Sequence, residues 1–196
     1  MNGIELAERL DRIESRAAIQ ELPVLYCLVM DERNVDGIRA IFSETATMRS
    51  IDGVFTAEGR EKIVETFRSR FDSLGPTNHF THGHIVRFDD HDPDLAYGSL
   101  GGHAELVRNS VPMVVALRYR DIYRRYDGIW QFEDRLMSYM YYLPVGEYEA
   151  GLGDSKSMRA YGDHRSADWP DALHDGDGSW LARYFPVPTP GGTSQP

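Results

Sequence analysis

The sequence predicts an α+β fold in which helices occupy the first part of the chain and long antiparallel strands follow. Apolar residues recur at helical spacing up to Leu74, and the period changes to two from His79 onward. An Asp127-Gly128 pair, which favours a two-residue hairpin turn, joins the last two strand-like segments. Helices followed by antiparallel strands are typical of folds that pack their helices on one face of a sheet.

The helical part divides into three expected elements. Residues 4–30 carry apolar side chains at three- and four-residue intervals, and Pro23 is expected to kink or restart this helix because it removes one backbone hydrogen bond. A short helix is expected over residues 34–42 and a longer one over residues 58–74. Between these two, β-branched residues around Asp52-Gly53 indicate a hairpin.

Four strands are expected after the helices, over residues 79–88, 94–107, 112–126 and 129–142. Each shows the alternation of a strand with one buried face, and polar segments such as DDHDPD at residues 89–94 separate them. No internal repeat is present in the sequence.

The composition changes after the last expected strand. We expect one domain over residues 1–145 and an irregular arm over residues 146–196, which is rich in Gly, Asp and Pro. A disordered tail rarely carries two tryptophans, and this segment contains Trp169 and Trp180. The arm is therefore expected to lie against the body or a neighbouring subunit, and to fray after about Pro188.

The bulk composition narrows the classes of function. A formal net charge of −10 disfavours binding to nucleic acid or to an anionic membrane, and we expect neither as a partner. The single cysteine, Cys27, leaves no intrachain disulfide and fits a reducing compartment. The charged N-terminus does not resemble a signal peptide, and no apolar run approaches the roughly 20 residues that span a bilayer. We therefore expect a cytoplasmic protein.

The stretch NHFTHGHIVRF holds three histidines, His79, His82 and His84, and is the first candidate for a functional site. It is either a catalytic base with two bystanders or an exposed strand face. Because His82 and His84 alternate with Gly83, both side chains are expected on the same face. A zinc or iron site is a third interpretation, but no Cys or acidic residue is placed to complete it, so we expect no bound metal.

Three motifs together carry a resemblance to a known family. They are SRAAIQEL…Y…D at residues 15–31, the His79 segment, and the hairpin YRRYDGIWQFEDR. In order and spacing they resemble the SnoaL-like branch of the nuclear transport factor 2-like superfamily, over residues 6–144. The resemblance implies a cone-shaped, strongly curved antiparallel sheet wrapped around the N-terminal helices. It also implies that this cystatin-like α+β barrel encloses an apolar pocket.

The resemblance also implies site residues. Members of the family pair an Asp that closes the first long helix with a His that opens a central strand, and these positions fall on Asp31 and His79. Dehydratases of bile acids in this family have a Tyr five residues before the Asp, where this chain has Tyr26. They also have an Arg five residues after the hairpin Trp, where Arg135 stands. Dehydrochlorinases have a Lys in place of the Tyr, so Tyr26 favours the dehydratase side.

These residue types suit proton abstraction without a cofactor. Neutral imidazole accepts a proton near pH 7, and a carboxylate on its other nitrogen fixes the tautomer. A phenol or guanidinium stabilises a developing oxyanion or protonates a departing hydroxyl. Tyr26 and Asp31 lie about 140° apart on an ideal helix, so both face one pocket only if the helix ends or unwinds near Asp31.

Simpler interpretations of the same residues stay open. Asp31 is also explained as a helix-end carboxylate, and Tyr26 as core packing. Arg135 is also explained by a pairing with a surface Asp121 across the hairpin.

We therefore expect a cofactor-independent lyase of the dehydratase type that acts on a hydrophobic, cyclic small molecule of polyketide, steroid or terpenoid character. An isomerase or polyketide cyclase is the first alternative, because proton removal by His79 is common to all three. A non-catalytic ligand-binding or assembly module is the second. We also expect a homo-oligomer, a dimer or trimer, because residues 137–142 on an open sheet would expose apolar surface.

Overall fold

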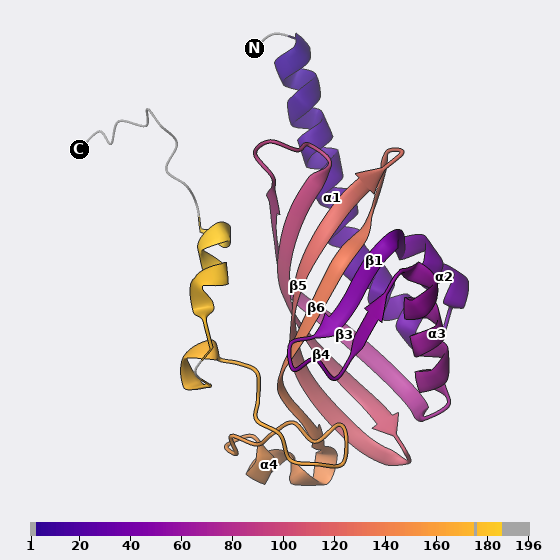
Figure 1. The fold of residues 1–196 in the computed structure, drawn as a ribbon, viewed down its shortest axis with the longest axis vertical. Coiled ribbons are helices and arrows are strands. Elements are labelled where there is room, and N and C mark those ends of the chain that lie inside the picture. The colour runs from indigo at the N-terminus through magenta and orange to yellow at the C-terminus, as the bar shows by residue number, and fades with distance from the viewer. Residues whose placement is uncertain (1–2, 175, 186–196) are drawn as a thin grey trace, which may run out of the picture.

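The fold is seen in a computed structural model that describes residues 3–174 and 176–185 (Figure 1). Within these residues, three longer helices pack with a six-stranded sheet. The helices are α1 (Gly3–Asp31), α2 (Val35–Ile41) and α3 (Arg60–Phe71). The strands are β1 (Phe42–Ser50), β2 (Thr56–Glu58), β3 (Leu74–Phe88), β4 (Leu95–Arg108), β5 (Val111–Tyr126) and β6 (Ile129–Pro144). The α+β class predicted from the sequence is confirmed.

Helix α1 runs as one element through Pro23, where the sequence predicts a kink or a restart. Its second half is buried in the body, with Ile19 and Tyr26 exposed by 0% and 4%. Its first turns project beyond the sheet (Figure 1), and Ile4 and Ile13 are 72% and 64% exposed there. In the described part of the chain, neither α1 nor any other helix is long and apolar enough to cross a membrane.

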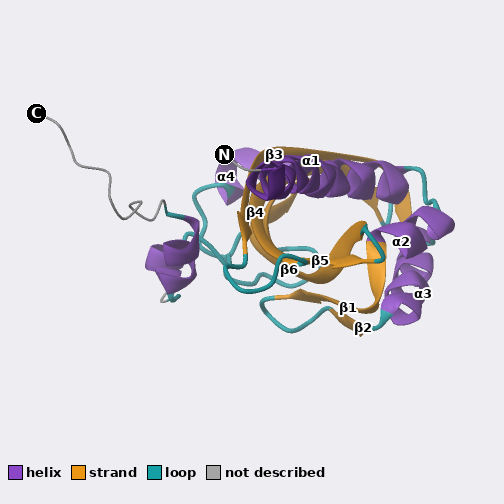
Figure 2. Cartoon of the chain, turned by 90° about the horizontal axis from the view of Figure 1, so that it is seen from above, coloured by secondary structure: helices purple, strands orange, loops and turns teal. Residues whose placement is uncertain are grey.

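The sheet has the strand order β2-β1-β6-β5-β4-β3. The pairs β3–β4, β4–β5 and β5–β6 are antiparallel, as the sequence predicts. Strand β1 lies parallel to β6, a pairing that the sequence does not indicate. Seen from above, the sheet curves strongly and α1 lies along its open side (Figure 2). The curved sheet around N-terminal helices that the resemblance implies is thus present, with one parallel pair in it.

Two glycines of β4 allow the large rings of β5 to lie close to the inner face of the sheet. A Cβ atom at Gly98 would come within 2.6 Å of the Tyr123 ring, and one at Gly102 within 3.1 Å of the Tyr119 ring. The two tyrosines are almost fully buried and form part of the main hydrophobic core. Any larger residue at Gly98 would displace a core ring.

A buried ion pair lies at the centre of this core. Arg135 of β6 donates hydrogen bonds to Asp121 of β5 from Nε at 3.0 Å and from Nη2 at 2.9 Å, and both side chains are 0% exposed. The guanidinium carbon lies 4.0 to 4.2 Å from the ring centroids of Tyr26, Tyr119 and Phe132. Burial alone lowers the pKa of Arg135, but the Asp121 carboxylate outweighs burial and the net pKa is raised.

A bulge in β3 separates two of the predicted site histidines. Gly83 adopts a left-handed φ of 51° where the pairing with β4 shifts register. The expectation that His82 and His84 share a face is therefore wrong, because a bulge inserts one extra residue into the alternation. Nε2 of His82 lies 2.5 Å from Nδ1 of His103 on the exposed face, whereas Nε2 of His84 lies 3.2 Å from the hydroxyl of the buried Tyr123.

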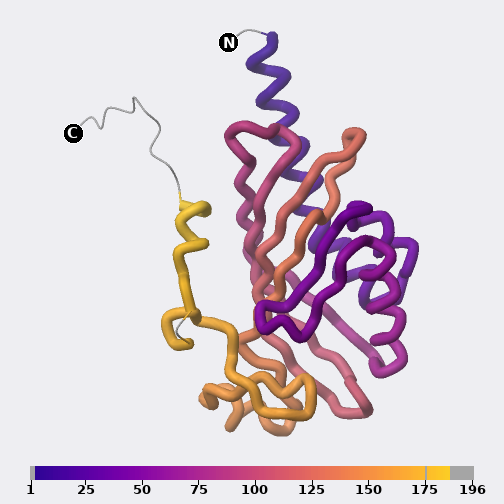
Figure 3. Tube along the Cα trace, viewed as in Figure 1, coloured from indigo at the N-terminus to yellow at the C-terminus, as the bar shows by residue number. Residues whose placement is uncertain are grey.

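The chain after β6 turns back along the body (Figure 3). Tyr142 of β6 exchanges backbone hydrogen bonds with residues 157 and 159, at 2.9 and 3.0 Å. Further along, the rings of Trp169 and Trp180 lie 4.4 and 5.4 Å from the guanidinium carbon of Arg118. The division into a domain over residues 1–145 and an arm over residues 146–196 stays a prediction, and the fraying expected after Pro188 lies outside the described residues.

The C-terminal segment changes the argument for an oligomer. Met137, Tyr139, Tyr141 and Tyr142 are buried within the single chain, with exposed fractions between 5% and 8%. Their expected exposure on an open sheet is therefore wrong. Met137, Tyr139 and Tyr142 line the internal cavity, and Tyr141 belongs to a buried cluster against which Trp169 of the returning segment packs. Exposed apolar side chains lie elsewhere, among them Ile4 and Ile13 on the first turns of α1, Leu28 later in the same helix, and Ile129 at the start of β6. The homo-oligomer, dimer or trimer, stays a prediction.

We expect Asp121→Asn to lower the free energy of unfolding by about 3–5 kcal/mol, because it leaves the buried charge of Arg135 without its counterion. Asp36→Asn is the matched control, since Asp36 pairs with Arg39 while its own side chain is 94% exposed. The control should lose less than about 1 kcal/mol. Urea denaturation measures both values, and equal losses would contradict the central role of the buried pair.

Stability should also fall in mild acid because of His84. Burial lowers the pKa of His84 to about 4, from an ordinary value of 6.5. Between these values the unfolded chain binds a proton that the folded chain excludes, so stability falls as the pH drops from about 6.5 towards 4. His84→Gln should remove this part of the loss, on the order of 2 kcal/mol after solvent screening. Urea denaturation at pH 7 and pH 5 tests it, and an acid loss of the same size in both proteins would refute it.

Candidate active site

Helix α1 ends at Asp31, and the carboxylate of this residue reaches the start of β3. Its Oδ1 accepts hydrogen bonds from Nδ1 of His79 at 2.5 Å and from Oγ1 of Thr77 at 2.8 Å. Its Oδ2 accepts one from the backbone N–H of His79 at 2.9 Å. The helix thus ends at Asp31, as the sequence analysis required, and Asp31 and His79 are brought together.

The carboxylate of Asp31 is held in its ionised form. Burial alone raises the pKa of Asp31, but the hydrogen bonds from His79 and Thr77 outweigh burial and the net pKa is lowered. An ionised carboxylate can only accept, so the neutral His79 ring carries its hydrogen on Nδ1 and its lone pair on Nε2. The two side chains are 19% and 20% exposed, which leaves the imidazole accessible from one side.

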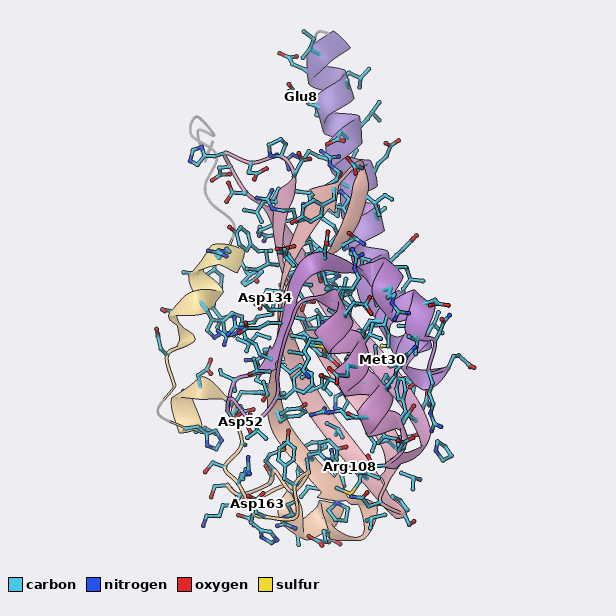
Figure 4. All side chains as sticks on the ribbon, turned by 45° about the vertical axis from the view of Figure 1, so that its right-hand side comes forward. Glu8, Met30, Asp52, Arg108, Asp134 and Asp163 are labelled. Atoms are coloured by element: carbon cyan, nitrogen blue, oxygen red, sulfur yellow. The ribbon has the colours of Figure 1, made fainter. Side chains whose placement is uncertain are left out.

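His79 lies in the wall of a cavity between the helices and the inner face of the sheet. The cavity volume is about 850 Å³ when the solvent-open space at its mouth is included. Tyr26 also lines the cavity, whereas Asp31 and Arg135 are not part of its lining. Figure 4 shows Met30, another lining residue, near the middle of the molecule. Most of the lining is apolar: Met30, Met48, Phe67, Phe71, Leu74, Ala104, Leu106, Val115, Leu117, Met137 and Ala160.

Tyr26 connects the cavity to the buried ion pair. Its ring packs edge-on against Tyr119 with centroids 6.0 Å apart, and Arg135 lies against it on the side of the core. Burial raises the pKa of Tyr26 to about 12, and the charge of Arg135 opposes this rise. The phenol is therefore protonated near neutral pH and can donate a hydrogen bond. The pairing of Arg135 with Asp121 that the sequence left open is present, in the core rather than at the surface.

One part of the lining is polar and was missed by the sequence analysis. Arg70, Arg108, Tyr142 and Tyr161 line the cavity together with the apolar residues. Arg108 is the last residue of β4, and Figure 4 shows it at the end of the sheet near the segment that carries Asp163. Tyr161 stands in that C-terminal segment, where large aromatic residues in a Gly- and Asp-rich context indicated contact with the body. Nothing in the local pattern marks the two arginines.

His82 and His84 lie apart from His79 and have different neighbours. His82 faces away from the cavity with His103, and His84 belongs to the buried group around Asp121. Across residues 3–174 and 176–185, no group of three or more His, Cys, Asp or Glu side chains is arranged to hold a metal ion. Of the four predicted site residues, His79 and Tyr26 line the cavity, whereas Asp31 contacts His79 and Arg135 contacts Tyr26 from outside the lining.

Solved structures share this fold. The crystal structure of LinA superposes with a TM-score of 0.63 at 25% identity, covering 70% of this chain and 94% of that one. A protein of Novosphingobium aromaticivorans, provisionally named scytalone dehydratase, superposes with a TM-score of 0.63 and covers 69% of this chain and 90% of its own. At 18% identity, the second likeness shows the fold alone.

Sequence comparison gives the same relationship. Gamma-hexachlorocyclohexane dehydrochlorinase of Sphingobium indicum is 26% identical over 137 residues, which cover 69% of this chain and 87% of that protein. The model of the SnoaL-like domain matches residues 11–135, well over half of the 196-residue chain. The resemblance inferred from the motifs is confirmed, and the chain belongs to the SnoaL-like domain family.

Proposed function

We propose that the protein is a cofactor-independent lyase of the dehydratase type, acting on a hydrophobic cyclic molecule of polyketide, steroid or terpenoid character. The observation that carries the proposal is the hydrogen bond between Asp31 and Nδ1 of His79 beside an apolar cavity. This bond leaves Nε2 of His79 as the proton acceptor. Within the described residues, no second imidazole and no carboxylate lines the cavity, so His79 is the base that it offers.

The proposed reaction begins when His79 removes a proton from a carbon next to a carbonyl group. The electron pair of the broken C–H bond forms a C=C bond, and the C–O bond to a hydroxyl on the neighbouring carbon breaks. Asp31 stabilises the imidazolium that forms, while Tyr26 gives its proton to the departing hydroxide, which leaves as water. The positive charge of Arg135, 4.2 Å from the Tyr26 ring, stabilises the phenolate. Proton exchange with solvent restores both groups.

The relative from Sphingobium indicum supports an elimination. Its name describes removal of hydrogen and chlorine from its substrate, which parallels removal of hydrogen and a hydroxyl group. An isomerase or a polyketide cyclase would begin with the same proton removal and use the same base. The mass of the product separates these reactions, because only a dehydratase yields a product lighter by one water.

The pH profile and a histidine variant test the base. On a cyclic hydroxy-ketone found by screening, kcat/KM should rise with pH to a plateau, because only neutral imidazole accepts a proton. His79→Ala should lower kcat by about two to four orders of magnitude. The matched control is His82→Ala on the opposite face, which should retain full activity. Full activity in His79→Ala would reject the proposal, and ligand binding without turnover in the wild type would favour a non-catalytic module.

A double variant tests whether Asp31 and His79 act as one unit. Asp31→Asn should be strongly impaired, because an amide can hold the imidazole in the wrong tautomer. Combining Asp31→Asn with His79→Ala should lower kcat scarcely further than His79→Ala alone, since residues of one unit are not additive. Steady-state kinetics on all three proteins, with circular dichroism to confirm folding, decide the matter. Losses that multiply would show that the two residues act independently.

A further inference from the structure

The cavity is cationic in a protein that is acidic overall. The chain carries 31 Asp and Glu residues against 21 Lys and Arg residues. Within the described residues, however, the cavity lining contains Arg70 and Arg108 and no carboxylate. Asp31, the acidic residue attached to the site, has its oxygens engaged by His79 and Thr77. A ligand in this cavity therefore meets positive charge that no acidic group of the lining neutralises.

Arg108 is held by aromatic residues rather than by an acid. Its guanidinium carbon lies 5.5 Å from the ring centroid of Tyr161 and 5.9 Å from that of Tyr142. Its Nε is buried without a hydrogen-bond partner in the described structure, and no carboxylate there lies within ion-pair distance of the guanidinium. The Tyr142 hydroxyl also accepts a hydrogen bond from Arg108. A partly buried guanidinium without a counterion suits an anionic ligand, because the anion supplies a further acceptor and a compensating charge.

Arg70 adds a second charge to the same wall. It stands in the last turn of α3, and its guanidinium carbon lies 4.3 Å from the ring centroid of Phe55. As with Arg108, no described carboxylate forms an ion pair with it. Burial raises the pKa of Tyr139, another lining residue, and the nearby charge of Arg70 opposes this rise. The charge of Arg70 therefore acts inside the cavity.

The sheet register fixes how far this charge lies from the base. His79 on β3 is paired with Ala104 on β4, and Arg108 lies four residues further along β4 on the same face. At about 3.4 Å per residue, the two positions are about 14 Å apart along the strand. Arginine is well suited to bind a carboxylate, because its planar guanidinium donates two parallel hydrogen bonds to the two carboxylate oxygens. Between His79 and Arg108 the lining contains the apolar Leu106 and Leu74 and the hydroxyl-bearing Thr77, whose hydroxyl is hydrogen-bonded to Asp31.

We propose that Arg108, assisted by Arg70, binds a carboxylate carried by an elongated apolar substrate. The acid group is held at the arginine end, and the apolar skeleton extends towards His79. Hydroxyls of Tyr142 and Tyr161 supply further donors around the carboxylate. The binding part of this inference stands on the cavity itself, and only the statement that the far end reacts rests on the proposed lyase function.

Calorimetry with a matched pair of probes tests the proposal. The probes are 4-biphenylcarboxylate and 4-biphenylcarboxamide, which share shape and apolar surface and differ in charge. At low salt the wild type should bind the acid at least about tenfold more tightly than the amide, as expected for a charge-assisted hydrogen bond. Arg108→Gln should abolish most of this preference, and Arg70→Gln part of it. Equal affinity of the wild type for acid and amide would overturn the proposal.

Two further variants keep the result interpretable. Arg68→Gln removes the same charge from an exposed position on the same helix as Arg70, and it should leave the acid preference intact. Arg108→Lys retains the charge and should retain part of the preference, which guards against misfolding as the cause of its loss. Acid preference that survives in the Arg70→Gln, Arg108→Gln double variant would overturn the proposal.

His79→Ala separates this inference from the proposed function. The variant should lose turnover and keep its preference for the acid, because His79 lies away from the arginines. Acid preference in a wild type without His79-dependent turnover would reject the lyase and uphold the acid-binding site. His79-dependent turnover of neutral substrates, with no preference for the acid probe, would support the lyase and reject the acid-binding site.

Discussion

The ion pair between Arg135 and Asp121 is the interaction on which the interior of the cone depends. Two charges without exposed surface persist in a core only when they are paired and hydrogen-bonded. Asp121 meets this condition by accepting two hydrogen bonds from Arg135 and one from the Tyr123 hydroxyl at 2.7 Å. Nη1 of Arg135 has no hydrogen-bond partner in the described structure, and the surrounding ring faces supply attraction in its place. Tyr26 and Tyr119 are two of these rings and also line the cavity. The ion pair therefore fixes the position of the part of the cavity wall that these two rings form.

The buried pair of Arg135 and Asp121 has no net charge. The charge of the ligand that the cavity favours therefore depends on other groups. Asp31 is ionised, but it lies behind His79, so its charge favours an imidazolium rather than meeting a ligand. Arg70 and Arg108 meet the ligand space directly. The proposed proton acceptor and the cationic groups therefore occupy separate parts of one largely apolar wall. The apolar side chains of this wall strengthen both interactions, because they lower the local dielectric constant.

Local patterns in the sequence predict the elements, because helical and strand periods depend on short-range order. The contact between Asp31 and His79, 48 residues apart, was expected only from the resemblance to a family. The helical period locates α1, and Asp127-Gly128 locates the β5–β6 hairpin. The bulge at Gly83 was missed although an isolated glycine within a strand pattern is a local signal for one, because the analysis assumed unbroken alternation across it. The burial of Arg135 and the parallel pairing of β1 with β6 depend on contacts between distant segments, which periodicity does not encode. The cavity arginines were missed for the same reason.

The boundary of the family match indicates how such a site can change its ligand. The match ends at residue 135, so Asp31 and His79, the proposed proton-transfer pair, lie inside it. Tyr142 and Tyr161 line the same cavity from outside it. The base is fixed by three hydrogen bonds between a helix end and a strand, and moving it would disturb the fold. The segment that carries Tyr161 is joined to β6 through backbone hydrogen bonds at Tyr142, which place few demands on side chains. Substitutions in that segment can therefore alter the surroundings of Arg108 while the geometry of proton transfer stays unchanged.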